Sequence, residues 1–464
     1  MKTIKTPILP VKPYFVKVKN QPHELDYKAI CVFSAFGFFL NTDTYWKDEK
    51  VLVPGSISTI DDEGYLIDSN YWFKWYYKPQ KINLEKAVED FGALFEKIVS
   101  KQSLNRKVIL PLSGGLDSRS QAVALNKIGA DVKSYSYSFE NGYKESNISK
   151  KIAKSCNFPF KEFTITKSYL WDRVHDLSKI NGCYSEFTHP RQMAVIDEIS
   201  KLGNSFSLGH WGDVLFDSDA YPDNSTNEEL LGILKKKVVK KGGLELAKSL
   251  WNNWNLAGDF ESYLDHRIIK LLGEIEIKNT NAKLRAFKSL YWAPRWTSVN
   301  LSIFESKQEI QLPYYDDEMC KFICSIPEEL LANRKIQIEY IKTTNAEVAN
   351  IVWQDAKPFN LHTYHLAKFP YNFPYRVAHK FKRIVASFWG KKFVQRNWEL
   401  QFLGKENQDK LSKYLFSKEL TALINKDIIH KYHDLFYQKN QVYYSHAVSM
   451  LLTLSLFLKR ETNE

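Results

Sequence analysis

The chain has 464 residues and a formal net charge of +12 at pH 7, with 44% hydrophobic and 25% charged residues. This composition is ordinary for a soluble globular protein, and the length allows two or three domains. The five cysteines are odd in number and scattered, which excludes a disulfide-based scaffold and favours a reducing compartment. No signal peptide or long apolar run is evident, so we expect a cytoplasmic protein without a transmembrane span.

The first 80 residues are predicted to be rich in β-structure. Short aromatic and β-branched runs alternate there with turn signals such as Pro54-Gly55. The apolar stretch from Ala29 to Leu40 is rich in Phe, Val and Gly, so we expect one or two strands that end at Asn41-Thr42-Asp43. These patterns predict a small β-rich N-terminal segment.

From residue 82 onward the pattern changes to alternating helices and strands. Helical periodicity covers 82–104, and residues 225–350 are predicted to be mainly helical. Between them we expect strands at 108–112, 132–139, 160–165 and 205–208, with helices at 116–128 and 145–156. This alternation predicts an α/β fold with a doubly wound, mostly parallel sheet. The apolar face of residues 448–458 predicts a packed amphipathic helix.

The most informative motif is Ser113-Gly114-Gly115-Leu116-Asp117-Ser118, which follows the first predicted strand of the sheet and opens a helix. Its two glycines allow the backbone to approach an anion, and N–H groups at a helix N-terminus favour negative charge. The hydroxyls of Ser113 and Ser118 add donors, whereas the carboxylate of Asp117 requires a cation beside it. The motif therefore predicts a site for pyrophosphate and Mg²⁺. It lacks the lysine of the Gly-x4-Gly-Lys-Ser/Thr loop.

A second motif covers residues 209–216 and begins with Gly209-His210-Trp211-Gly212-Asp213. It comes directly after the predicted strand at 205–208. Ligands of open parallel sheets bind beyond the carboxyl ends of the strands. Because both motifs occupy such ends, we expect them to meet at one site.

Five segments, in the same order, resemble the asparagine synthetase family, whose synthetase domain is an N-type ATP pyrophosphatase with a pyrophosphate loop. The resemblance covers residues 50–360 and is carried by residues 113–118, Tyr143-Lys144-Glu145-Ser146, residues 209–216, residues 313–316 with Ile326-Pro327, and Lys357-Pro358-Phe359. It implies an adenine nucleotide alpha hydrolase-like fold, ATP as co-substrate and Mg²⁺ as cofactor.

The resemblance also implies roles for individual residues. Asp117 and Asp213 would be the magnesium ligands, and Lys357 would be a catalytic residue facing the negative charge that develops in the transition state. The residues that would bind ATP or its pyrophosphate are Leu112, Ser113, Gly114, Gly115, Asp117, Ser118, Tyr137, Ser138 and Gly209.

Several residues depart from the family's motifs. His210, a candidate catalytic residue, replaces a glutamate implicated in proton transfer, and it either moves a proton or only packs and hydrogen-bonds. Val214 and Gln311 replace a second glutamate and an arginine, which indicates a changed acyl substrate. Arg119 could pair with a phosphate or a substrate carboxylate, or form a salt bridge on the helix surface.

The N-terminus departs from the glutamine-dependent members, which begin with a catalytic cysteine after Met1. This chain has Lys2 at that position, and residues 51–62 resemble only the tail end of a glutaminase domain. We therefore expect no functional N-terminal glutaminase. The amine would be ammonia or another amine, with a separate glutaminase as one source.

We expect three parts in the chain. They are a β-rich segment at 1–80, an asparagine synthetase-like ATP pyrophosphatase domain at 81–360, and a basic helical part at 361–464 packed on that domain. From Leu361 to Trp398 there is no Asp or Glu, but there are eight Lys or Arg residues. This pattern is typical of a solvated basic helix or of a peripheral contact with an anionic membrane or acidic glycan.

The sequence thus favours an ATP-dependent, amide-forming ligase that activates a carboxylate as an acyl-adenylate, releases pyrophosphate and admits an amine. The carboxylate is either aspartate or a larger group such as a sugar acid or peptide. Two alternatives stay open: a tRNA-modifying enzyme with the same loop, and a degenerate, non-catalytic homologue.

Overall fold

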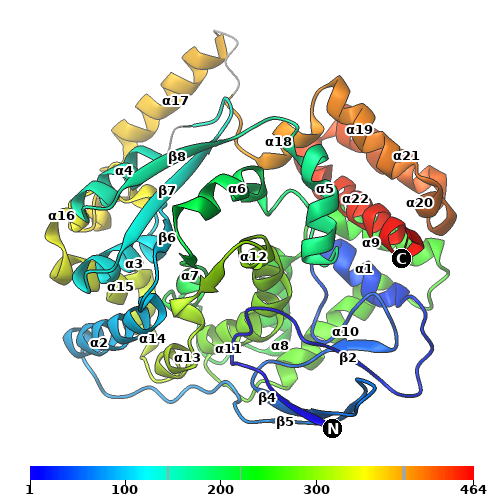
Figure 1. The fold of residues 1–464 in the computed structure, drawn as a ribbon, viewed down its shortest axis with the longest axis horizontal. Coiled ribbons are helices and arrows are strands. Elements are labelled where there is room, and N and C mark those ends of the chain that lie inside the picture. The colour runs from blue at the N-terminus through cyan, green and yellow to red at the C-terminus, as the bar shows by residue number, and fades with distance from the viewer. Residues whose placement is uncertain (144–145, 220, 389–392, 464) are drawn as a thin grey trace.

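A five-stranded, fully parallel sheet forms the centre of the nucleotide-loop region (Figure 1). The computed structural model describes residues 1–143, 146–219, 221–388 and 393–463. The sheet has the order β10-β9-β6-β7-β8, with strands β6 (Val108–Pro111), β7 (Val132–Phe139), β8 (Phe160–Ile165), β9 (Ser205–Ser207) and β10 (Glu309–Gln311). The predicted α/β fold with a parallel, doubly wound sheet is confirmed. The sequence did not indicate β10, a three-residue strand within a largely helical stretch.

Helices cover both faces of this sheet. The predicted helices are confirmed as α2 (Leu84–Ser103), α3 (Leu116–Lys127) and α4 (Ser146–Ser155). In Figure 1, α3 and α4 lie on the outer side, and α6 (Ile196–Ile199) and α12 (Ser298–Glu305) lie on the inner side. The rings of Phe206 on β9 and Phe304 on α12 pack with centroids 5.0 Å apart. Because both faces are covered, the central strand β6 is apolar and buried from Val108 to Leu110.

The prediction of strands between Ala29 and Leu40 is wrong, because this stretch forms helix α1 (Tyr27–Phe36). The side chain of Asp26 accepts a hydrogen bond from the backbone N–H of Ala29 and begins the helix. Gly37, with φ of 82°, ends it in the left-handed conformation. Every residue from Ala29 to Phe36 is buried. A helix buried on all sides has no polar stripe, so its sequence resembles that of a buried strand.

The rest of the N-terminal segment contains five short strands joined by loops, in agreement with the predicted β-structure. Strands β1 (Lys2–Lys5), β4 (Ser56–Ile60) and β5 (Leu66–Tyr71) form an antiparallel sheet, and β2 (Phe15–Lys17) pairs with β3 (Glu49–Val51). The segment is tied to the main body by the backbone N–H of Ile8, which donates to the carboxylate of Asp317 over 2.8 Å.

Most of the remaining chain is helical, as predicted. The first group contains α5 (Tyr169–Asn181), α7 (Gly212–Leu215), α8 (Asn227–Val238), α9 (Lys241–Asn253), α10 (Phe260–Gly273), α11 (Thr280–Phe287), α13 (Asp317–Ile323), α14 (Glu328–Leu331), α15 (Lys335–Thr344) and α16 (Ala346–Ala349). The second group contains α17 (Phe373–Phe388), α18 (Asn397–Phe402), α19 (Lys405–Leu415), α20 (Lys418–Leu423), α21 (Lys426–Asp434) and α22 (Gln441–Asn463).

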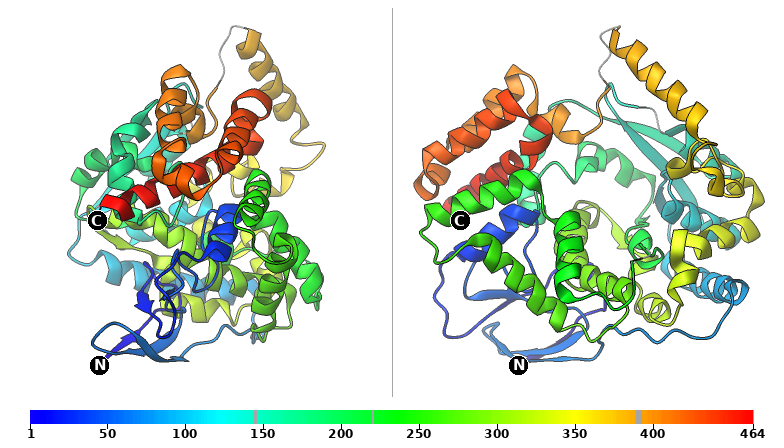
Figure 2. Two further views of the ribbon diagram at one scale, coloured as in Figure 1. Left: turned by 90° about the vertical axis from the view of Figure 1, so that its right-hand side faces the viewer. Right: turned by 180° about the vertical axis from the view of Figure 1, so that it is seen from behind.

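Helix α22 differs from its prediction in one respect. The stretch at 448–458 is helical, but it is not amphipathic, because every residue from Ala447 to Phe457 is buried. It packs against α9, α19 and α20, and α9 in turn packs on α1 (Figures 1 and 2). The helices on this side of the molecule therefore share one core.

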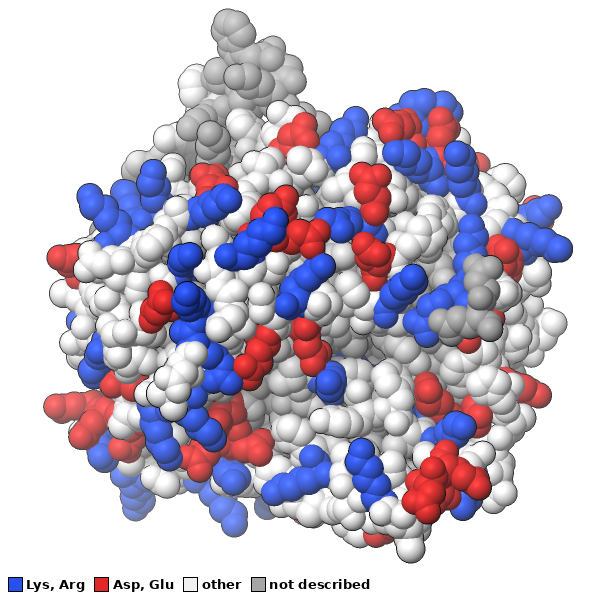
Figure 3. Space-filling model, in the orientation of Figure 1, with Lys and Arg blue, Asp and Glu red and all other residues white. Residues whose placement is uncertain are grey.

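The charge distribution on the surface and the hydropathy of the helices both bear on the sequence-based expectations. Lys and Arg are interspersed with Asp and Glu over the face in Figure 3, so the positive net charge is not one continuous patch there. Among the helices of the described ranges, none is long and apolar enough to cross a membrane.

Candidate functional site

The loop between β6 and α3 is held in a compact turn by its own hydroxyl groups. The backbone N–H of Ser113 donates to Ser118 Oγ over 3.1 Å, and the two serine hydroxyls lie 3.0 Å apart. The N–H of Gly115 donates to Ser113 Oγ over 3.2 Å. Gly115 is the N-cap of α3 and has no side chain to cap it, so the helix N-terminus stays open toward an anion.

The segment that carries Lys357 docks on this loop. The N–H of Gly114 donates to Gln354 Oε1 over 3.1 Å, and the N–H of Gln354 donates to the carbonyl of Gly114 over 3.2 Å. A Cβ at Gly114 would lie 2.7 Å from the Cβ of Gln354, so glycine permits this close approach. Lys357 itself is half-buried and forms no ion pair with the described residues.

Arg119 strengthens the same contact. Its guanidinium is fully buried and donates to the carbonyl oxygens of Ile351 and Val352 over 3.0 Å and 2.9 Å. Burial lowers the pKa of Arg119 to about 10. The suggested pairing of Arg119 with a phosphate, a substrate carboxylate or a surface carboxylate is therefore wrong, because its donors are directed into the protein.

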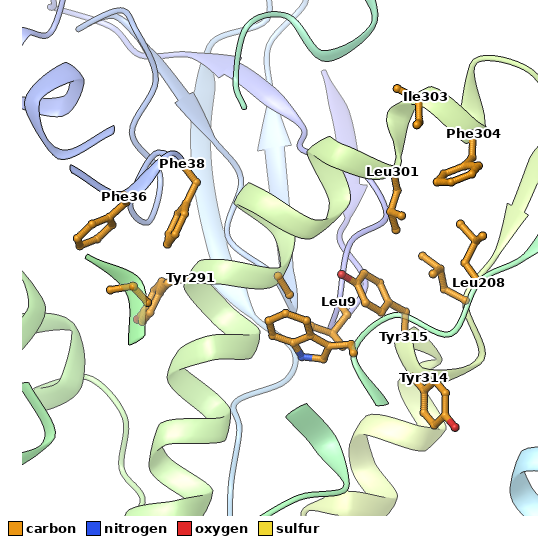
Figure 4. Packing of buried hydrophobic residues seen from close by; sticks show 14 of the residues in the cluster. Leu9, Phe36, Phe38, Leu208, Tyr291, Leu301, Ile303, Phe304, Tyr314 and Tyr315 are labelled. Carbon is orange, nitrogen blue, oxygen red and sulfur yellow. The ribbon is translucent and has the colours of Figure 1, made fainter. Parts of the chain in front are cut away.

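The two predicted motifs meet, as expected. Motif 209–216 leaves β9 and enters the short helix α7, and Trp211 takes the left-handed conformation with φ of 80°. A Cβ at Gly212 would collide with Asp117 Oδ1, and one at Gly209 would lie 3.1 Å from the backbone nitrogen of Ser118. The glycines thus let the second motif approach the first. Leu208, just before the motif, lies in the same part of the core as Phe304 and Tyr315 (Figure 4).

The carboxylate of Asp117 has two partners that the sequence did not indicate. Arg334 forms an ion pair with Asp117 Oδ1, and Gln337 Nε2 donates to the same oxygen over 3.0 Å. Burial raises the pKa of Asp117 to about 6; the charge of Arg334 opposes this effect and that of Asp213 adds to it. Arg334 reaches the site because Asn333 and Arg334 both adopt left-handed conformations. Asn333 is a usual residue for that geometry, but nothing in the sequence marked Arg334.

The residues fit a metal ion that arrives with phosphates. Asp117 lies in the first turn of α3, which follows β6, and Asp213 lies in α7, which follows β9; the charge of Asp213 acts on Asp117. Mg²⁺ in phosphate sites is held by one or two carboxylates together with phosphate oxygens. Within the described ranges, no group of three or more His, Cys, Asp or Glu could hold a metal ion. The second oxygen of Asp117, Oδ2, takes part in no hydrogen bond with a described residue, so it is open to a ligand.

His210 lies near enough to Asp213 and Arg191 for the charges of both to act on it. Its Nδ1 is buried and has no hydrogen-bond partner among the described residues. Burial lowers the pKa of His210 to about 4; Asp213 opposes this effect and Arg191 adds to it. The ring is therefore neutral at physiological pH, and a neutral imidazole nitrogen can accept a proton.

A cavity of 510 Å³ opens beside the loop, and we refer to it as the nucleotide cleft. Five predicted nucleotide-binding residues line it: Leu112, Ser113, Gly114, Tyr137 and Ser138. Gln354 and Arg191 also line it, and Arg191 Nε donates to the hydroxyl of Tyr137 over 2.6 Å. Val394 also lines the cleft. Its backbone N–H donates to the carbonyl of Asn141 over 3.1 Å, and it forms an isolated β-bridge with Gly142. Residues 144–145 of the predicted segment 143–146 lie outside the described residues.

The sheet is parallel, and two of its strands lead into glycine-containing motifs. This arrangement is typical of α/β proteins that bind ligands at the carboxyl ends of their strands. A family model described as asparagine synthase matches residues 90–339, and the chain belongs to this family. This membership supports an ATP-dependent enzyme of an amide-forming or pyrophosphate-loop family.

Other comparisons add little. No curated protein sequence matches the chain. One solved structure that matches is NMN synthetase from Francisella tularensis, which shares 14% identity over 45% of this chain and 92% of that one, with a TM-score of 0.23. The family match alone supports the assignment.

Proposed function

We propose that this protein is an ATP-dependent ligase that activates a carboxylate as an acyl-adenylate and transfers the acyl group to an amine. The observation that carries the proposal is the meeting of the two strand-end motifs, which brings Asp117, Gly209 and Gly212 into contact beside an open helix N-terminus. Such a place suits a leaving pyrophosphate better than a neutral ligand.

In the first step, a carboxylate oxygen of the substrate attacks the α-phosphorus of ATP. The bond from the α-phosphorus to the bridging oxygen breaks, and pyrophosphate leaves. The backbone N–H groups and the hydroxyls of Ser113 and Ser118 would bind this pyrophosphate, and Lys357 would stabilise the charge at phosphorus. Mg²⁺ held by Asp117 and Asp213 would neutralise the phosphate charge.

In the second step, an amine nitrogen attacks the acyl carbon, loses a proton, and AMP leaves with the bonding electrons. His210 would accept that proton. Its neutral ring suits this role, although a pKa of about 4 makes it a weak base. The amine would be ammonia or a small amine.

The test measures AMP and pyrophosphate formed from ATP and Mg²⁺ with a panel of carboxylates and ammonia. We expect AMP only when both Mg²⁺ and one class of carboxylate are present. AMP formation that depends instead on added tRNA would favour the tRNA-modifying alternative. A complete lack of AMP formation with every carboxylate would contradict the proposal and favour a non-catalytic homologue.

A separate arm tests the amine source. Glutamine replaces ammonia in the same reaction, and free glutamate is measured. We expect no glutamate and no amide from the purified chain. Steady release of glutamate would contradict this part of the proposal.

A further inference from the structure

A second cavity, of 570 Å³, lies next to the nucleotide cleft, and no part of the mechanism above uses it. We call it the second cavity. It is bordered by the start of α9, by residues 395–398, by the start of α22 and by the segment that contains Thr188 and His189. Arg191 and Gln395 line both cavities, so the two are neighbours across one wall.

The lining of the second cavity carries an excess of positive charge. Arg191, Lys240 and Lys241 form no ion pair with a described residue, and Arg396 has only a 3.6 Å contact with Glu399. The N-terminus of α9, which starts at Lys241 and has no side-chain cap, adds its partial positive charge. These groups together favour an anionic ligand.

Glu186, the one acid among the described lining residues, offsets one of these positive charges and leaves the cations in excess. Glu186 Oε2 accepts from the backbone N–H and the hydroxyl of Thr188, over 2.8 Å and 2.7 Å, and from the hydroxyl of Ser449. Its Oε1 lies 3.4 Å from His189 Nε2. Glu186 is thereby a fixed part of the cavity floor.

Neutral polar side chains, whose oxygens can accept hydrogen bonds from a ligand, complete the lining. They are contributed by Asn440, Tyr443 and Ser445 at the start of α22 and by Asn397 at the start of α18. Asn397 is oriented by hydrogen bonds of 2.9 Å to the hydroxyl of Tyr169 and the carbonyl of Thr188. A surface of this kind suits hydroxyl groups.

We propose that the second cavity binds the part of the acyl substrate that lies away from the reacting carboxylate, and that this part carries a second anionic group and hydroxyls. The inference rests on the proposed function. The substrate class is a hydroxylated acid with at least two negative charges. Arg191 would mark the passage between its reacting end in the nucleotide cleft and its remote end.

The test titrates three compounds of the same chain length into protein saturated with Mg²⁺ and α,β-methylene-ATP. They are galactarate with two carboxylates, gluconate with one, and neutral sorbitol. We expect galactarate to bind about tenfold more tightly than gluconate, and sorbitol not to bind. The double variant Lys240→Gln/Lys241→Gln should lose this preference and keep its affinity for the nucleotide.

The matched control is Lys236→Gln/Lys270→Gln, which removes the same charge from exposed positions outside the cavity and should behave like the wild type. Intact nucleotide binding without preference for galactarate would overturn the inference alone. An unchanged preference in Lys240→Gln/Lys241→Gln would also overturn it. Failure to bind α,β-methylene-ATP would contradict the proposed function, and with it the inference.

An independent observation concerns α17, which projects from the body of the protein (Figures 1 and 2). Five of the 13 large hydrophobic side chains exposed among the described residues lie between 369 and 381: Phe369, Tyr371, Phe373, Val377 and Phe381. The last three are spaced by four residues and share one face of α17. Helix α17 packs extensively against no other described element.

The exposed cations Arg376 and Lys380 border this apolar face, and residues 361–398 contain no acid. Four further Lys or Arg residues occur between 381 and 395, but the structure does not describe their side chains. An exposed apolar face bordered by cations is typical of helices that lie in the surface of an anionic membrane. A nucleic acid would use the cations but leave the apolar face in water.

We infer that α17 docks on anionic lipid headgroups. The test is co-sedimentation with phosphatidylcholine vesicles that contain or lack phosphatidylglycerol. We expect binding only with phosphatidylglycerol, weakened about fivefold for each cation removed in Arg376→Gln and Lys380→Gln. Val377→Ser/Phe381→Ser should also release the protein, whereas Leu104→Ser, at a distant exposed position, should not. Equal binding to both vesicles, or binding to single-stranded RNA alone, would overturn the inference.

Discussion

The nucleotide cleft and the second cavity are built in opposite ways. The cleft takes most of its residues from short, contiguous motifs, in which glycines and backbone N–H groups meet at strand ends. The second cavity takes its residues from segments that lie between Glu186 and Ser449, and its chemistry is in long cationic side chains. The comparison teaches that the site proposed to bind ATP is built from residues close together in the sequence, whereas the site proposed to select a substrate is built from residues far apart in it.

The largest effect should come from the cleft. Asp117→Asn keeps the shape of the side chain but removes the charge that would hold Mg²⁺ and that pairs with Arg334. We expect carboxylate-dependent AMP formation to fall about 10³-fold. Burial raises the pKa of Asp117, so protons compete with Mg²⁺ for its carboxylate, and the Mg²⁺ concentration needed for half-maximal activity should rise as the pH falls.

Exposed Asp131 provides the control, since Asp131→Asn makes the same chemical change on the surface. It should leave AMP formation unchanged. Wild-type turnover by Asp117→Asn would show that the two motifs meet for a reason other than metal binding.

The next effect concerns His210, whose pKa is affected by burial and by the charges of Asp213 and Arg191. His210→Ala should still form adenylate, measured as carboxylate-dependent exchange of pyrophosphate into ATP, while amide formation falls about 10²-fold. The ring of the wild type should titrate by NMR near pH 4, well below the ordinary value for histidine, because it is buried. The control is His266→Ala, at an exposed position on α10. Normal amide formation by His210→Ala would make His210 a packing residue.

A smaller effect is expected from Arg119, which stabilises the cleft without facing it. Arg119→Met leaves the partly buried carbonyls of Ile351 and Val352 without their donors, and we expect the free energy of unfolding to fall by about 3 kcal/mol. Urea unfolding measures this change. The surface pair of Arg106 with Glu309 gives the control, because Arg106→Met should cost less than about 1 kcal/mol. If Arg119→Met lost ATP affinity but not stability, the side chain would be facing the nucleotide.

Much of the fold and of the cleft could be predicted from the sequence, because short-range rules govern both. Alternating apolar strands and amphipathic helices identified the parallel sheet, and small residues after β6 and β9 identified the ligand-binding edge. Helix α1 was missed because its burial on all sides removes the helical period. Arg334 was missed because 217 positions separate it from Asp117 in the sequence, and only the fold brings the two together. The second cavity was missed because its lysines and arginines are ordinary surface residues until the fold brings them together.

The smallest effect should come from the floor of the second cavity, where His446 on α22 packs against α1 and α9. A ring nitrogen of His446 donates to the carbonyl of Ser34 over 3.1 Å, and a Cβ at Gly243 would lie 2.5 Å from the ring. Burial lowers the pKa of His446 to about 4, although Glu186 opposes this effect; Lys240 and His189 add to it. The unfolded chain therefore takes up a proton below pH 6.5 that the folded protein does not take up until about pH 4, so stability falls as the pH falls between these values.

We expect His446→Gln to lose about 2 kcal/mol less unfolding free energy than the wild type between pH 7 and pH 5, measured by urea unfolding. His266→Gln should match the wild type. An identical loss in His446→Gln would mean that the ring carries a proton in the folded protein, and the floor of the second cavity would then be more positive than the side chains of its rim alone make it.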